Sequence, residues 1–291
     1  MSKHVLLSAF ADEIDMDLTT QMDVLDTHGI KHIEMRGVNG KNISEVTVEE
    51  AVEIKNQLDA RGFKISSLGS PVGKIYLKDD FEAHKAMFVH LLEVAKILES
   101  KYMRIFSFFM EKDTNHDDYA NEVISHLKEL SAIASPYDIT LLHENEKDIY
   151  GDTSARCLNL VEKVNCENFK LVFDPANFVQ CGENPFVTYS LLKDHVAYYH
   201  IKDARSSDSV VVPAGEGDGQ ISQIIKELTS ERDYHGFLSL EPHLGNFAGF
   251  AALENIEEGE VEELEQSDAG KFGIAVDALK TILSTQNIAH A

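Results

Sequence analysis

The 291 residues include 50 acidic and 26 basic side chains, which gives a formal net charge of -24. Such a charge repels a polyphosphate backbone, so we expect no nucleic acid partner. The content of 43% hydrophobic and 26% charged residues is typical of a globular protein with a sizeable core and excludes disorder as the global state.

The start of the chain, MSKHVLLSAFADEID, has an apolar run that is too short for a signal peptide or a membrane helix. The sequence therefore predicts a cytoplasmic protein with no membrane partner. Cys157, Cys166 and Cys181 are odd in number and lack a C-x-x-C spacing. We interpret them as reduced thiols, because this pattern fits neither a disulfide framework nor a cysteine zinc site.

Short apolar runs alternate with amphipathic stretches along the whole chain, as in βαβ units around a parallel sheet. The predicted strands cover residues 5–10, 32–35, 64–68, 102–108, 139–142, 170–173, 196–199 and 237–240. The predicted helices lie near 18–29, 47–61, 80–99, 117–134, 153–164, 185–195, 219–230 and 266–284. Eight of each predict an α/β fold, a single (β/α)8 TIM barrel that forms one domain over residues 1–291.

A doubly wound open sheet gives the same local alternation, but no strand here is followed by G-x-G-x-x-G, so the barrel is favoured. Gly29, Gly62 and Gly236 each precede an apolar run, where a glycine can close a helix in the left-handed conformation. The acidic stretch at residues 253–268 is interpreted as a solvated loop or helix extension, with a lid or an oligomer contact as alternatives.

Four polar residues directly follow the last four strands: Glu144, Asp174, His200 and Glu241. The carboxyl ends of barrel strands form one rim, so these side chains should converge there. Three carboxylates on one rim repel one another and are costly to desolvate, and a divalent cation removes that conflict. The ligand types predict one ion of Mn2+, Zn2+, Mg2+ or Co2+ and do not choose among them.

Each of the four also has an ordinary structural interpretation. Asp174 can form a turn with Pro175, and His200 can be a hydrogen-bonded core residue. Glu144 and Glu241 can each cap a helix or pair with a basic side chain. Their occurrence after four successive strands favours the metal site.

Further residues on the same predicted rim are candidates for substrate contacts. Arg36 and Lys74 are cations that either bind a phosphate or carboxylate or neutralise the carboxylate ring. Lys202 should share the inward face of its strand with His200, where it polarises a substrate oxygen or forms a salt bridge in the barrel wall.

Two carboxylates and one loop complete the candidates. Glu146 and Asp203 are expected beside the ligands, which they would orient, although Glu146 can equally cap the next helix. The segment VPAGEGDGQ, which contains Glu216, is interpreted as a loop that covers the substrate. Its alternatives are an anion site made of backbone N–H groups and a simple glycine turn.

The segments HENEKDIYGDT, LVFDPANF, YYHIKDA, VPAGEGDG and SLEPH resemble the sugar phosphate isomerase/epimerase family with the xylose isomerase-like TIM barrel. The relatives of that family include ketose 3-epimerases, inosose dehydratases and endonuclease IV. The resemblance covers nearly the whole chain and implies Glu144, Asp174, His200 and Glu241 as ligands of one metal ion. It also implies the two glutamates as an acid/base pair.

One position departs from the family pattern. Ketose 3-epimerases generally have a histidine three residues after the aspartate ligand, whereas this chain has Asn177. An asparagine can donate a hydrogen bond to a substrate oxygen, but it cannot carry a proton between pH 5 and 8. Asn177 is therefore expected to bind substrate, and the substrate chemistry of those epimerases does not transfer directly.

The expected activity is metal-dependent isomerisation or epimerisation of a small sugar or sugar phosphate by proton transfer through a cis-enediolate. One alternative is a dehydratase acting on an inosose-like keto-polyol, and another is a barrel that binds carbohydrate without catalysis. A nuclease like endonuclease IV would need a cationic groove and further histidine ligands, and the net charge of -24 speaks against such an activity. A sugar or polyol is the expected partner, and assembly into a homo-oligomer is compatible with the sequence.

Overall fold

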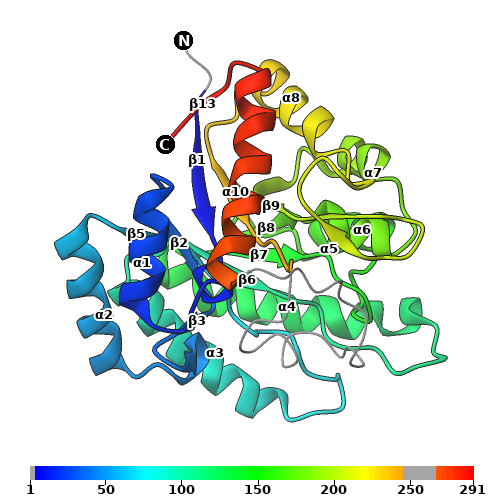
Figure 1. Cartoon of the computed structure of the whole chain (residues 1–291). Coiled ribbons are helices and arrows are strands. Elements are labelled where there is room, and N and C mark those ends of the chain that lie inside the picture. The colour runs from blue at the N-terminus through cyan, green and yellow to red at the C-terminus, as the bar shows by residue number, and fades with distance from the viewer. Residues whose placement is uncertain (1–3, 245–266) are drawn as a thin grey trace.

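The computed structural model describes residues 4–244 and 267–291, and eight parallel strands form a closed barrel at its centre (Figure 1). The strands are β1 (His4–Ala9), β2 (His32–Met35), β5 (Lys64–Leu68), β6 (Tyr102–Ile105), β7 (Thr140–Glu144), β8 (Phe169–Phe173), β9 (Val196–Ile201) and β12 (Phe237–Leu240). Each pairs with the next in this order, and β12 pairs with β1 to close the barrel. The predicted (β/α)8 barrel is confirmed.

Helices cover the outside of the barrel because each buries one apolar face against the strands. They are α1 (Leu18–Thr27), α2 (Val48–Arg61), α3 (Phe81–Ile97), α4 (Ala120–Ala134), α5 (Ser154–Val164), α6 (Pro175–Gln180), α7 (Pro185–Leu192), α8 (Ile221–Glu231) and α10 (Asp268–Thr285). Several helices begin at a residue whose side chain caps the first turn. The Asp17 side chain accepts a hydrogen bond from the Thr20 N–H before α1, and the Thr47 side chain accepts one from the Glu50 N–H before α2.

Two of the three glycine predictions are confirmed. Gly29 and Gly62 have φ angles of 68° and 70° and lie between a helix and the next strand. The prediction for Gly236 is wrong, because Asp233 with φ 51° is the left-handed residue after α8. Gly236 instead lies against the Tyr234 ring, where an added Cβ would come within 2.4 Å of the hydroxyl oxygen.

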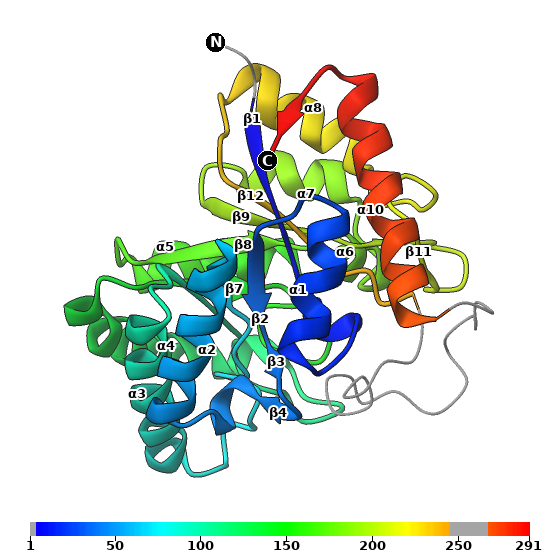
Figure 2. The same cartoon turned by 60° about the vertical axis from the view of Figure 1, so that its left-hand side comes forward.

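The shortest elements were not predicted. They are α6, the hairpins of β3 (Gly37–Val38) with β4 (Lys41–Asn42) and of β10 (Asp203–Ala204) with β11 (Val211–Val212), and β13 (Ala289–His290). Such pieces are too short to show a period. Strand β13 pairs with β1, so the two ends of the described chain lie side by side (Figure 2). The acidic stretch at 253–268 lies outside the described residues except for its last two positions.

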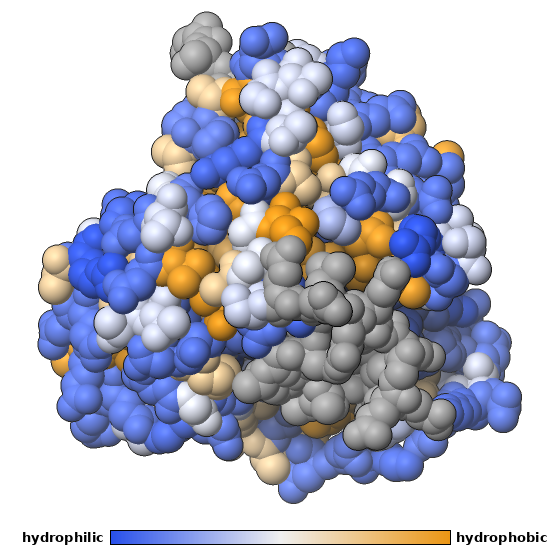
Figure 3. Space-filling model, in the orientation of Figure 1, coloured by the Kyte–Doolittle hydropathy of each residue, from blue (hydrophilic) through white to orange (hydrophobic). Residues whose placement is uncertain are grey.

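Hydrophilic side chains dominate the face shown in Figure 3, in keeping with the charge of the chain. None of the described helices is both long and apolar enough to cross a membrane. The three cysteines are free thiols, as predicted. Polar groups also occur inside the barrel, where Ser8, Ser66 and Tyr198 form a buried hydrogen-bonded chain.

Candidate metal centre

The barrel brings Glu144, Asp174, His200 and Glu241 together at the carboxyl ends of four adjacent strands. Glu144 is the last residue of β7, His200 lies near the end of β9, and Asp174 and Glu241 directly follow β8 and β12. All four are at most 2% exposed. Residues spread over almost a hundred positions of sequence thus share one buried point.

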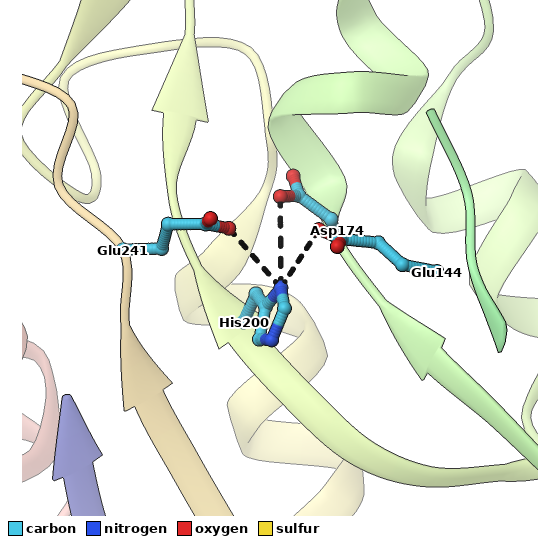
Figure 4. Close-up of side chains that lie close together, drawn as sticks. All are labelled: Glu144, Asp174, His200 and Glu241. Atoms are coloured by element: carbon cyan, nitrogen blue, oxygen red, sulfur yellow. Dashed lines mark hydrogen bonds and ion pairs between the residues drawn. The ribbon is translucent and has the colours of Figure 1, made fainter. Parts of the chain in front are cut away.

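Three carboxylates face one nitrogen of His200 (Figure 4). The Nδ1 atom lies 2.9 Å from Glu144 Oε1, 3.2 Å from Glu241 Oε2 and 4.0 Å from Asp174 Oδ2. One donor atom from each of the four residues lies within 4.8 Å of the other three. This spacing fits four ligands around a single small cation.

The donor atoms are also chemically suited to a divalent ion. Asp174 uses Oδ1 to accept the Asn177 N–H at the start of α6, so its Oδ2 stays directed to the site. Asp174 Oδ2 and Glu241 Oε2 are buried and accept no hydrogen bond from the described residues. Buried carboxylate oxygens without such a partner are costly unless a cation is beside them.

The electrostatics of the cluster show the same need for positive charge. Burial raises the pKa of Asp174 to about 6, with Glu144 and Glu241 adding repulsion against the pull of Lys202. For Glu144, burial acts in the same direction, but His200 and Arg104 overcome it and lower the pKa to about 2. The pKa of His200 lies well above its usual value because its carboxylate neighbours outweigh burial.

Two cations flank the four residues. Lys202 Nζ lies 2.9 Å from Asp174 Oδ2 and 3.6 Å from Glu241 Oε2. Arg104, from the middle of β6, lies 3.2 Å from Glu144 Oε2 and 3.5 Å from Glu241 Oε1. Both cations are placed to contact a ligand bound at the same carboxylates.

Arg36 is the counter-ion of a second group of carboxylates behind the site. Its guanidinium lies 2.8 Å from Asp12 Oδ2, 3.3 Å from Glu13 Oε1 and 3.0 Å from Glu241 Oε1. Glu13, Glu241 and His243 have donor atoms within 4.8 Å of one another, and Arg36 already supplies positive charge to both glutamates. This geometry supports the neutralising role that was one of the two alternatives for Arg36. Arg36 also lines the cavity, so the other alternative, a contact with substrate, remains a prediction.

We expect Arg36→Met to destabilise the metal-free protein by about 3–5 kcal/mol, because it leaves buried carboxylates without their cation. Urea unfolding measures this change. Arg61→Met is the matched control, since Arg61 pairs with Asp23 and Asp26 at the surface, where such pairs contribute at most ~1 kcal/mol. An equal loss of unfolding free energy in both variants would contradict the role of Arg36 as the counter-ion of the buried carboxylates.

A cavity opens beside the four residues, and Glu144 and Glu241 line it. Lys74 lies on its wall, 3.0 Å from Glu146 Oε2 and over the Phe106 ring. Asn177 also lines it and donates to the Asn145 carbonyl, while the Asn145 side chain bridges back to the Asp174 backbone. Glu146, Lys74 and Asn177 are therefore brought to one cavity with the candidate ligands.

Asp203 does not line this cavity but fixes the glycine loop. Its carboxylate accepts the N–H groups of Gly215, Gly217 and Gly219 at 2.8, 3.2 and 2.7 Å. A Cβ on Gly217 or Gly219 would lie 2.4 or 2.6 Å from Asp203 Oδ1. These N–H groups thus already bind an anion from within the protein, the Asp203 carboxylate. Glu216 is exposed and is absent from the described lining of the cavity, so its substrate contact remains a prediction.

Three residues near the centre were not predicted: Glu34, Arg104 and His243. Glu34 and Arg104 are charged residues within apolar strands, and that unusual placement is the signal that could have identified them. His243 lies two residues beyond Glu241, 3.5 Å from its Oε1, and its place at the end of the SLEPH segment is the signal that could have identified it.

Comparisons with known proteins agree with the fold. A model of the xylose isomerase-like TIM barrel family matches residues 22–265. Among curated proteins, the chain is 22% identical to a probable L-ribulose-5-phosphate 3-epimerase, UlaE, of Mycoplasma pneumoniae, over 62% of this chain and 60% of that protein. It is 20% identical to an inosose dehydratase of Lacticaseibacillus casei over 91% of each.

Among solved structures, the IolI protein with a bound zinc atom superposes with a TM-score of 0.73 at 17% identity, covering 97% of this chain and 99% of that one. At this identity the likeness shows the fold.

Proposed function

The chain belongs to the xylose isomerase-like TIM barrel family, and on that premise we propose that it is a metal-dependent isomerase or epimerase of a small sugar or sugar phosphate. The observation that carries the proposal is the convergence of Glu144, Asp174, His200 and Glu241 around one point beside a cavity. The epimerase among its relatives and the zinc in the IolI structure support it.

The four residues would hold one divalent ion, which would act as a Lewis acid on a substrate carbonyl. Glu144 and Glu241 lie on opposite sides of His200 (Figure 4). One carboxylate takes the proton from the carbon beside the carbonyl, which gives a cis-enediolate, and the other returns a proton from the opposite side. Lys202 and Arg104, which lie beside the same carboxylates, would supply positive charge to the developing oxyanion.

Dehydration is the second candidate, because the inosose dehydratase matches 91% of the chain and Asn177 replaces the histidine of ketose 3-epimerases. In that reaction the enolate expels a β-hydroxyl group and is not reprotonated. The product is an enone, which absorbs in the ultraviolet.

The proposal is tested with a panel of ketoses, inososes and sugar phosphates, incubated with the Mn2+-loaded protein in D2O. We expect solvent deuterium at the carbon beside the carbonyl of the product, because both carboxylates exchange their protons with solvent. Turnover without deuterium would indicate a hydride shift. An absorbing enone would identify the dehydratase.

A further inference from the structure

Glu34 places a carboxylate inside the barrel, directly behind His200. It is the third residue of β2 and is fully buried. Its Oε2 lies 3.2 Å from Nε2 of His200, whose side chain is also fully buried. Within the described ranges, neither Glu34 oxygen accepts a hydrogen bond and His200 is its ion-pair partner. A buried carboxylate that accepts no hydrogen bond is costly unless positive charge lies beside it.

The pairing of β2 with β5 is irregular at this residue. Ile33 lies opposite Ile65, whereas Glu34 lies opposite Ser67, so the register shifts by one residue between them. Bulges of this kind redirect a side chain and are common next to active sites. The irregularity therefore coincides with the residue whose side chain reaches across the barrel to β9.

The two nitrogens of the His200 ring face different partners. Nδ1 faces Glu144, Asp174 and Glu241, and Nε2 faces Glu34. The rings of Phe10 and Tyr198 pack edge-on against the imidazole, with centroids 5.2 and 5.9 Å away. Aromatic contacts fix the plane of the ring, but they do not distinguish its two nitrogens.

A carboxylate does distinguish them, because it accepts a hydrogen bond and cannot donate one. We propose that Glu34 is a positioning residue for the centre: from its ion-pair distance of 3.2 Å it would accept the Nε2–H of His200 once the ion is bound, and so leave the Nδ1 lone pair directed at the ion. This inference rests on the proposed function, since it assigns a role toward the metal described there. Partners of this kind fix the tautomer and the orientation of metal-binding histidines.

The experiment compares metal affinity in metal-free parent protein and in Glu34→Gln, Glu34→Leu and Ser8→Ala. Competition with a fluorescent chelator gives the Kd for Mn2+. We expect Glu34→Leu to raise that Kd roughly 10–100-fold. Glu34→Gln should recover part of the loss, because its amide oxygen still accepts the Nε2–H. Ser8 is equally buried in the barrel interior but bonds to Ser66, so Ser8→Ala should leave the Kd unchanged.

A second readout follows the ring itself. Nitrogen NMR spectra of the Zn2+-loaded parent should show His200 protonated at Nε2. In Glu34→Gln, a fraction of the protein should lose that single state, since the amide can also donate to Nε2. Melting of the metal-free variants checks their folding, and the glutamine variant carries the test if the leucine variant does not fold.

The outcomes separate this inference from the proposed function. Unchanged affinity in both Glu34 variants, with a parent that binds the metal, overturns the positioning role alone. Equal weakening by Ser8→Ala overturns it too, because the effect would then belong to the barrel interior in general. A parent that binds no divalent metal refutes the metal centre and this inference with it.

Discussion

Glu241→Gln and Glu144→Gln are each expected to lower turnover roughly 10²–10⁴-fold, the contribution of a positioned acid or base. Glutamine keeps the size of the side chain and can still offer an oxygen to the ion, but it neither takes nor returns a proton. The two residues act in one proton transfer, so the double variant should lose little more than the slower single variant.

Steady-state kinetics at saturating metal measures this effect, with bound metal determined in the same samples. Glu53→Gln, an exposed glutamate on α2, is the control and should leave turnover unchanged. Near-parental turnover in either active-site variant would remove that residue from the acid/base pair. Losses that multiply in the double variant would indicate two independent roles.

Removal of the metal should have the second large effect. Dialysis against a chelator is expected to reduce turnover to background and to lower the melting temperature, because three buried carboxylates lose their common cation. An ion present at a hundred times its Kd stabilises the fold by about 2.7 kcal/mol. Readdition of Mn2+, Zn2+, Mg2+ or Co2+ should restore both, and the most effective ion identifies the preferred metal.

Calorimetry of stripped and reloaded protein measures the stability, and the activity assay measures the recovery. His200→Ala provides the control, since a variant that binds almost no ion should respond little to the metal. Full turnover after stripping would contradict a role of the ion in catalysis.

The fold could be predicted closely because strands and helices alternate with strong and different periods. The strands at 32–35, 64–68 and 237–240 match the structure to the residue. The convergence of the four polar residues followed from the topology alone, because parallel strands of a barrel end at one rim. A local signal, a polar residue directly after an apolar run, was enough to find them.

The supporting residues depend on information that is not local. Glu34 reaches His200 through a register irregularity that the alternation of β2 does not reveal. Arg104 is an inward residue of β6 whose role depends on Glu144, which lies on the neighbouring strand β7 but forty residues away in sequence. Asp203 holds a loop whose N–H groups turn toward it only after folding. Each case depends on contacts between distant segments.

The most direct measurement is the metal content of the parent and of His200→Ala after equilibrium dialysis against Mn2+ or Zn2+. We predict about one ion per chain in the parent and almost none in the variant. A parent without metal, or a variant that still binds one ion per chain, would contradict a centre built from Glu144, Asp174, His200 and Glu241.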